Sequence, residues 1–156
     1  MFQIRITMND IKITHFRRDN SGKKFPAYRT LSSPDMEIIR ETLRNSLSLD
    51  DKISDLELTV IVDGMQTAIS QFNALKEDFI LIDVFEECSI KPSNYVYINW
   101  HRYDDIDEMN VNDLIEYFDD IWYPDSDDID IFDSTLSWIV SVSHNGSIKF
   151  LKKNKP

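Results

Sequence analysis

The chain has 156 residues, one cysteine and a formal net charge of −11 at pH 7. Its length suits a single domain, residues 1–156, and its hydrophobic fraction of 42% is typical of a globular protein rather than a disordered one. The single cysteine excludes an intrachain disulfide, and the acidic composition disfavours nucleic acids and anionic membranes as partners.

The N-terminal segment carries Arg5 and lacks the apolar run of a signal peptide. No window approaches the roughly 18 apolar residues that a membrane-spanning helix needs. We therefore expect a cytoplasmic protein without membrane contact.

Charged residues are distributed unevenly along the chain. Residues 1–29 contain seven lysines and arginines and two aspartates, whereas residues 103–148 contain thirteen carboxylates and no lysine or arginine. The two segments could pair inside the fold or leave a negative surface. Because so many carboxylates have no cation nearby in the sequence, we expect a negative surface on the C-terminal half.

The first predicted elements are two short strands. Residues 2–8 alternate apolar and polar side chains, and residues 11–15 continue the alternation with Ile11 and Ile13. This pattern predicts an N-terminal hairpin.

A helix is predicted next, within residues 32–49. Ser33 is suited to the N-cap and Pro34 to the first helical position. Arg40 and Arg44 are expected elsewhere on the helix surface. The apolar stripe consists of Met36, Ile39, Leu43 and Leu47.

Strands dominate the predictions for the middle of the chain. Alternation over residues 56–62 and 65–71 around Asp63-Gly64 predicts a hairpin, because Asp-Gly suits a tight turn. A helix over residues 66–76 is the competing interpretation. Residues 78–85 and 95–101 are rich in aromatic and β-branched side chains and are predicted as further strands.

The last predicted elements are a helix and a hairpin. Asn110 or Asn112 can cap a helix over residues 110–122, and residues 136–152 form a hairpin that turns at Asn145-Gly146. The sum is an α+β fold: a single domain with a mainly antiparallel sheet and two main helices packed on one face.

Motifs for catalysis or cofactors are absent from the sequence. The run 125–136 has the wrong residues at positions six and twelve for a calcium loop, and the three histidines have no ligand at metal spacing. Cys88 follows Glu86 and Glu87, which favour the inert thiol over the thiolate. We therefore expect no metal, no cofactor and no enzymatic activity. A hydrolase built on paired carboxylates stays open as an alternative.

Aromatic residues among the carboxylates suggest a binding surface instead. Phe118, Trp122 and Trp138 fall on apolar faces and fit a core, whereas Tyr103 and Tyr117 fit a core less well. Aromatic anchors within a charged rim are typical of protein interfaces. The candidate partner-binding residues are Asp119, Asp120, Tyr123, Asp125, Asp127 and Asp128.

The segment 116–148 also resembles the C-terminal part of small immunity proteins from bacterial polymorphic-toxin and contact-dependent inhibition systems. The resemblance lies in the acidic helix that ends in "DDIWYP", in the following "SDD" and "IFD", and in the Trp-containing strand before a His-x-Gly hairpin. It implies a protein that binds and neutralises one cognate toxin, which we expect to be basic and of the nuclease type. The alternative is a non-catalytic interaction module whose acidity serves solubility.

Overall fold

The computed structural model describes residues 10–153, so the predicted strand over residues 2–8 lies outside the described part. Helices and strands are interspersed along the described part of the chain. In chain order they are α1 (Asp10–Asp19), β1 (Tyr28–Thr30), α2 (Ser33–Ser46), α3 (Asp55–Met65), β2 (Thr67–Asn73), α4 (Leu81–Glu87), β3 (Tyr95–Asn99), β4 (Ile106–Asn110), α5 (Val111–Glu116), α6 (Phe118–Ile121), β5 (Ile129–Phe132), β6 (Trp138–Val142) and β7 (Ser147–Lys152).

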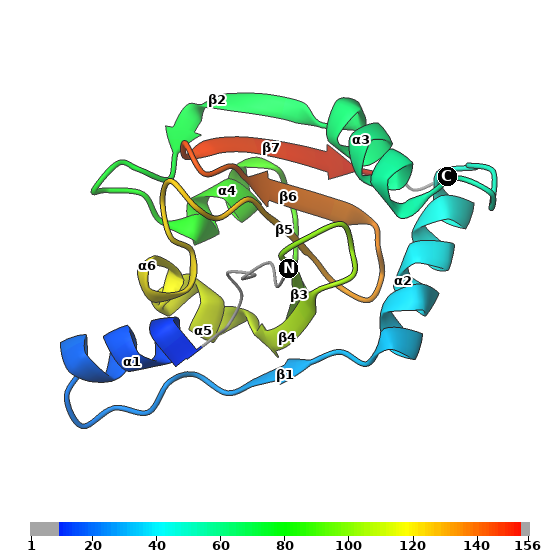
Figure 1. Cartoon of the computed structure of the whole chain (residues 1–156). Helices are drawn as coiled ribbons and strands as arrows, with labels where there is room; N and C mark the ends of the chain where they lie inside the picture. The colour runs from blue at the N-terminus through cyan, green and yellow to red at the C-terminus, as the bar shows by residue number, and fades with distance from the viewer. Residues whose placement is uncertain (1–9, 154–156) are drawn as a thin grey trace.

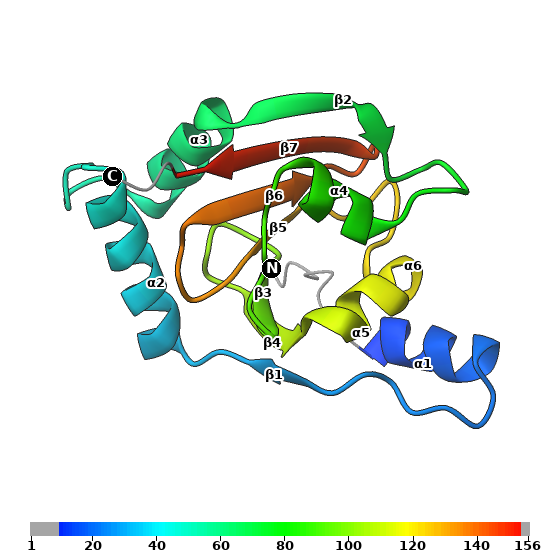
Figure 2. The same ribbon diagram turned by 180° about the vertical axis from the view of Figure 1, so that it is seen from behind.

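The strands form one antiparallel sheet of seven strands in the order β1-β4-β3-β5-β6-β7-β2. Figure 1 shows this row from β2 and β7 at the top to β4 and β1 at the bottom. In both Figure 1 and Figure 2, helices α1, α5 and α6 gather at one corner, while α2 and α3 lie at the opposite end of the molecule. The predicted α+β class with a mainly antiparallel sheet is confirmed.

Two cores lie on the two faces of the sheet. One contains Leu81, Val84 and Phe85 of α4 and the apolar residues of α5 and α6, and the other contains the buried residues of α2 and α3. The two helices that the sequence predicted therefore lie on opposite faces. Successive side chains of a strand point to opposite faces of the sheet, and all five residues of β6 are buried. Both faces of the sheet are therefore apolar, and each is covered by helices.

The N-terminal prediction of a second strand is wrong, because residues 11–15 belong to α1. This helix buries Lys12 and Phe16, which are four residues apart, and leaves Ile11 56% exposed. An apolar pattern cannot reveal that spacing when one of the two buried residues is a lysine.

The predicted strands over residues 56–62 and 78–85 are helices as well. Helix α3 begins at a capping box in which Ser54 Oγ accepts a hydrogen bond from Glu57 N at 3.1 Å and lies 3.2 Å from Glu57 Oε1. It continues through Asp63 and Gly64, so the predicted turn there is also wrong. For the next segment a strand over residues 65–71 and a helix over residues 66–76 were both open, and the structure has strand β2 there. Helix α4 buries Leu81, Val84 and Phe85 at helical spacing.

Other predictions are confirmed with small shifts. The N-cap of α2 is Ser32, one residue before the predicted Ser33, and its hydroxyl accepts from Asp35 N at 3.2 Å. Asn110 caps α5, and Tyr117 separates α5 from α6 where one helix was expected. The final hairpin turns at residues 143–146, where Gly146 has a φ of +86°.

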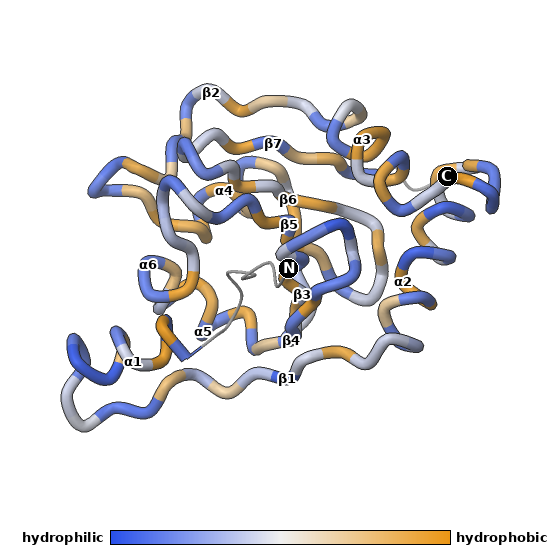
Figure 3. The backbone as a smooth tube through the Cα atoms, viewed as in Figure 1, coloured by the Kyte–Doolittle hydropathy of each residue, from blue (hydrophilic) through white to orange (hydrophobic). Residues whose placement is uncertain are grey.

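The hydropathy of the chain follows this architecture. Figure 3 shows hydrophobic positions along β6 and at intervals in α3, and hydrophilic positions in the loops. Among the helices of residues 10–153, none has both the length and the apolar character that crossing a bilayer requires.

Candidate functional site

The loop after α6 is fixed by the carboxylate of Asp127. This side chain is 2% exposed, and its Oδ2 lies 2.5 Å from Lys12 Nζ and accepts a hydrogen bond from Tyr123 N at 2.8 Å. Lys12 Nζ also donates to Ile121 O and lies 4.3 Å from the centre of the Trp100 ring. Burial lowers the pKa of Lys12, and the hydrogen bond and charge of Asp127 raise it in part.

The basic and acidic segments thus meet inside the fold. Arg29 of β1 pairs with Glu108 of β4 at 3.2 Å, in addition to the Lys12–Asp127 pair. Burial also removes several carboxylates of the acidic segment from the surface. The fully buried ones are Asp107, Asp127 and Asp133. The negative surface is therefore smaller than the sequence suggests.

The six predicted contact residues separate into three groups. Asp119, Asp125 and Asp128 are exposed, whereas Asp120 and Tyr123 are half-buried and Asp127 is buried. Asp127 is 2% exposed and paired with Lys12, so its side chain is not accessible to a partner in this structure. Burial raises the pKa of the Asp120 carboxyl, and a hydrogen bond from Asn20 lowers it in part.

The tyrosines assigned to a binding surface lie mostly inside. Tyr103 is 1% exposed and packs in the core below α2 and α3. Tyr117 is half-buried, and its ring meets Phe16 edge-on at 5.4 Å between centres. Tyr123 lies with its hydroxyl 3.1 Å from His15 Nδ1 and its ring 4.5 Å from Lys12 Nζ.

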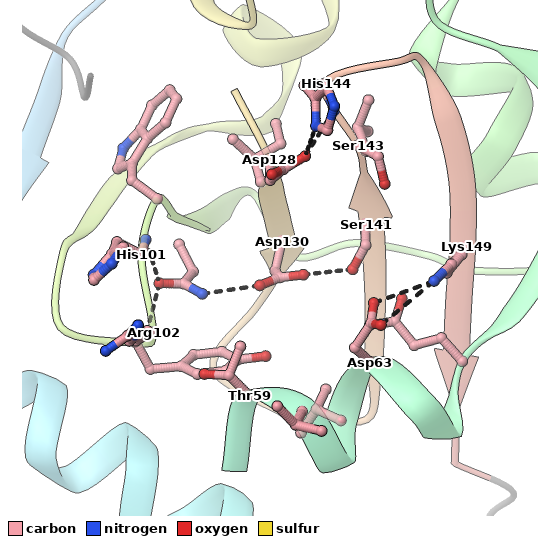
Figure 4. Close-up of a pocket in the computed structure, with 18 of the residues that line it drawn as sticks. Thr59, Asp63, His101, Arg102, Asp128, Asp130, Ser141, Ser143, His144 and Lys149 are labelled. Atoms are coloured by element: carbon pink, nitrogen blue, oxygen red, sulfur yellow. Dashed lines mark hydrogen bonds and ion pairs between the residues drawn. The ribbon is translucent and has the colours of Figure 1, made fainter. Parts of the chain in front are cut away.

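Beside this loop lies a cavity of about 560 Å³, which we call the Asp130 cavity. Its walls come from α3, from the connection between β3 and β4, from β5 and from the turn between β6 and β7. Figure 4 shows Asp130 near its centre, with the Asp128–His144 pair above and the Asp63–Lys149 pair to one side. A volume of several hundred Å³ suits a small molecule or a single long side chain.

A row of polar residues on adjacent strands crosses the floor of the Asp130 cavity. The sheet register pairs Asn99 of β3 with Asp130 of β5, pairs Asp130 with Ser141 of β6, and pairs Ser141 with Lys149 of β7. Residues in register on neighbouring strands point to the same face, so the register itself brings these four side chains together.

Asn99 connects this floor to the loop that follows β3. Its Nδ2 donates to Asp130 Oδ2 at 2.9 Å, while its Oδ1 accepts from Tyr103 N at 2.8 Å and from His101 N at 3.2 Å. Arg102 and Tyr103 both have a left-handed backbone, with φ of 48° and 58°. Asn99 thereby holds an unfavourable loop conformation in place at the cavity wall.

Asp130 receives only neutral hydrogen bonds. Besides Asn99, Ser141 Oγ donates to Asp130 Oδ1 at 2.5 Å, and no lysine, arginine or histidine within residues 10–153 forms an ion pair with it. Burial raises the pKa of the Asp130 carboxyl, the bonds from Ser141 and Asn99 lower it in part, and the charges of Asp63 and Asp128 raise it further.

The charged groups of the walls are largely paired with each other. Lys149 Nζ lies 3.3 Å from Asp63 Oδ1, His144 Nδ1 lies 2.9 Å from Asp128 Oδ1, and His101 Nδ1 lies 3.1 Å from Asp104 Oδ1. Arg102 is exposed at the rim. Burial raises the pKa of Tyr103 strongly, and the charges of Asp130 and Asp63 add to this effect.

A second cavity, of about 680 Å³, surrounds Asp133 and is called the Asp133 cavity. Asp133 accepts hydrogen bonds from five donors, which are Ser93 N and Oγ, Thr135 N and Oγ1, and Trp138 Nε1. Burial raises the pKa of its carboxyl, but these bonds together lower it below the ordinary value. Lys152 and Lys153 on its wall donate to backbone carbonyls.

Metal ligands and a reactive thiol are two further kinds of site that the described residues could offer. In residues 10–153 no group of three or more histidine, cysteine, aspartate or glutamate side chains is arranged to hold a metal ion. Cys88 is buried, and burial followed by the charge of Glu87 raises the pKa of its thiol. This agrees with the direction that its acidic neighbours predicted.

Sequence reasoning missed the Asp130 cavity because it missed β5. No strand is predicted over residues 129–132 in the acidic run, although "IDIF" alternates apolar and polar residues as a strand does. Comparisons with known proteins add no assignment: no protein-family model, no curated protein and no solved structure gives a significant match to this chain.

Proposed function

We propose that this protein binds and neutralises a basic partner protein, as do the immunity proteins that residues 116–148 resemble. The supporting observation is the rigid acidic loop after α6. Asp127 ties the loop to Lys12 and Tyr123, and the backbone of Asp125 donates to His144 O at 2.9 Å. The backbone that carries the exposed Asp125 and Asp128 is thus anchored to the rest of the fold. A rigid surface loses little conformational entropy when it binds.

The surroundings of this loop suit a protein interface. His144 N donates to Asp128 Oδ1 at 2.7 Å, so the loop and the turn between β6 and β7 form one continuous surface. Val60 of α3 is 62% exposed and lines the neighbouring Asp130 cavity. An apolar residue beside fixed charges provides contact area as well as electrostatic attraction.

The test is to co-express this protein with the polypeptide encoded next to its gene and to measure both growth and binding. We expect protection from a toxic neighbour, and a loss of binding when Asp125 and Asp128 are both changed to lysine. The matched control is the double change Asp83→Lys and Glu86→Lys, which alters exposed acids of α4 instead of the loop. Equal effects of both double variants would contradict the proposed surface.

A hydrolase that uses paired carboxylates is the second candidate. The observation in its favour is the Asp130 cavity, which both Asp128 and Asp130 line, Asp128 being exposed and Asp130 half-buried. Incubation with oligosaccharide and oligonucleotide substrates tests it. Turnover that disappears in Asp130→Asn would favour the hydrolase over the binding protein.

A further inference from the structure

Asp130 is a half-buried carboxylate, and no cation within residues 10–153 forms an ion pair with it. Burying a charge is costly unless it is paired, and two neutral hydrogen bonds compensate it only in part. The same chain pairs Asp127 with Lys12 elsewhere, at 2.5 Å. Asp130, by contrast, lies at the floor of an open cavity, where a cation can arrive from outside.

The groups that face Asp130 from the surrounding elements favour a positive ligand. Lys149, His144 and His101 each already lie beside another carboxylate. With neutral histidines, three carboxylates and two permanent cations line the cavity. The charged and titratable groups on its walls are Asp63, His101, Arg102, Tyr103, Asp128, His144 and Lys149.

Gln66 provides a second and independent indication. Gln66 lines the same cavity, and its Oε1 is buried and has no hydrogen-bond donor within the described residues. A buried acceptor without a donor costs free energy. A donor-only ligand would meet the charge of Asp130, and a rotation of the Gln66 side chain toward the cavity would let the same ligand satisfy its acceptor.

We propose that the Asp130 cavity binds the guanidinium group of an arginine side chain on the basic partner. This inference rests on the proposed function. Guanidinium carries five donors in one plane and accepts no hydrogen bond, so it can meet acceptors on several walls at once. It is also less strongly hydrated than an ammonium group, and therefore easier to bury. Val60, which is 62% exposed on the cavity wall, supplies apolar surface for the methylene groups of the side chain.

The test is an NMR titration of the full-length protein with N-acetyl-arginine amide, whose blocked ends carry no charge. We expect amide shifts at Asn99, Asp130 and Ser141. N-acetyl-citrulline amide has nearly the same shape without the charge, and we expect it to bind at least about tenfold more weakly, as the loss of a charge-assisted hydrogen bond implies. N-acetyl-lysine amide should bind more weakly than the arginine compound.

Two variants localise the binding. Asp130→Asn keeps the shape of the side chain and removes its charge, so affinity for the arginine compound should fall about tenfold or more. Gln66→Leu should weaken binding to a smaller degree. The control is Asp83→Asn, the same chemical change on exposed α4, which should leave affinity unchanged. Circular dichroism and the unfolding midpoint of each variant establish that it is folded.

The proposal is overturned if citrulline amide binds as well as arginine amide, or if folded Asp130→Asn keeps full affinity. Equal or tighter binding of the lysine compound would overturn the choice of guanidinium. These outcomes are separate from the test of partner binding: a partner that binds through Asp125 and Asp128 while the arginine amide does not bind would retain the proposed function and remove this inference.

Discussion

Asp130 lies in β5 and Asp133 directly follows that strand, and each lies at a cavity, yet their surroundings differ sharply. Asp133 is surrounded by five donors, which outweigh burial and lower the pKa of its carboxyl. Asp130 has two neutral donors, and burial raises the pKa of its carboxyl. The hydrogen-bond acceptors of Asp133 are thus fully used within the fold, whereas Asp130 can accept further hydrogen bonds from a ligand.

This difference separates structural acids from candidate functional acids within one acidic run. Asp127 belongs with Asp133, because Lys12 and Tyr123 N satisfy its buried carboxylate. Buried polar groups in folded proteins are normally satisfied, so the exception is the informative one. Three substitutions to asparagine can therefore rank these acids by their contribution to stability.

The largest effect is expected for Asp127→Asn. The change removes the carboxylate that Lys12 contacts inside the protein, and breaking a buried pair on one side typically costs about 3–5 kcal/mol of unfolding free energy. Urea denaturation measures it. Adding Lys12→Met to Asp127→Asn should recover part of this loss, and a double variant whose cost equals the sum of the two single variants would show that the pair does not interact.

A smaller loss is expected for Asp133→Asn, about 1–3 kcal/mol at neutral pH, because charge-assisted hydrogen bonds are replaced by neutral ones. A carboxyl with a lowered pKa stabilises the fold above its unfolded pKa, near 3.8, and this stabilisation is lost as pH falls through the folded value. The difference between Asp133→Asn and the wild type should therefore shrink at low pH. A difference that stays constant down to acid pH would contradict the assignment.

The smallest effect on stability, with the opposite sign, is expected for Asp130→Asn. The raised pKa of Asp130 in the folded protein means that ionisation of this carboxyl favours unfolding. Its contribution to stability is present below the ordinary pKa of 3.8 and is lost as pH rises through the folded pKa. At neutral pH the variant should be as stable as the wild type or more stable, by at most about 1 kcal/mol. A loss as large as that of Asp133→Asn would show that Asp130 is a structural acid.

The sequence predicted the α+β class, helix α2, strand β3 and the last hairpin, because caps, periodicity and turn residues are local signals there. It failed for α1 and α3. The helical pair in α1 is Lys12 with Phe16, and no scale of hydrophobicity marks a lysine as a core residue. In α3 the alternation outweighed the Ser54–Glu57 capping box, which was visible in the sequence.

The candidate site was harder to predict than the fold. The contact residues were predicted from the density of carboxylates, which is high in the loop after α6. In that loop Asp125 and Asp128 are exposed but Asp127 is not. The Asp130 cavity depends on the register of Asn99, Asp130 and Ser141 across three strands. Contacts of that kind join distant parts of the chain and leave no pattern within a single segment.

The measurement that tests the central claim most directly is the pKa of Asp130, followed by the carbon-13 shift of its carboxyl group. In the free protein we expect a value above the ordinary 3.8, because burial without a cation favours the neutral form. Saturation with N-acetyl-arginine amide should lower it, because a bound cation favours the carboxylate. A pKa at or below the ordinary value in the free protein, unchanged by the ligand, would contradict the account.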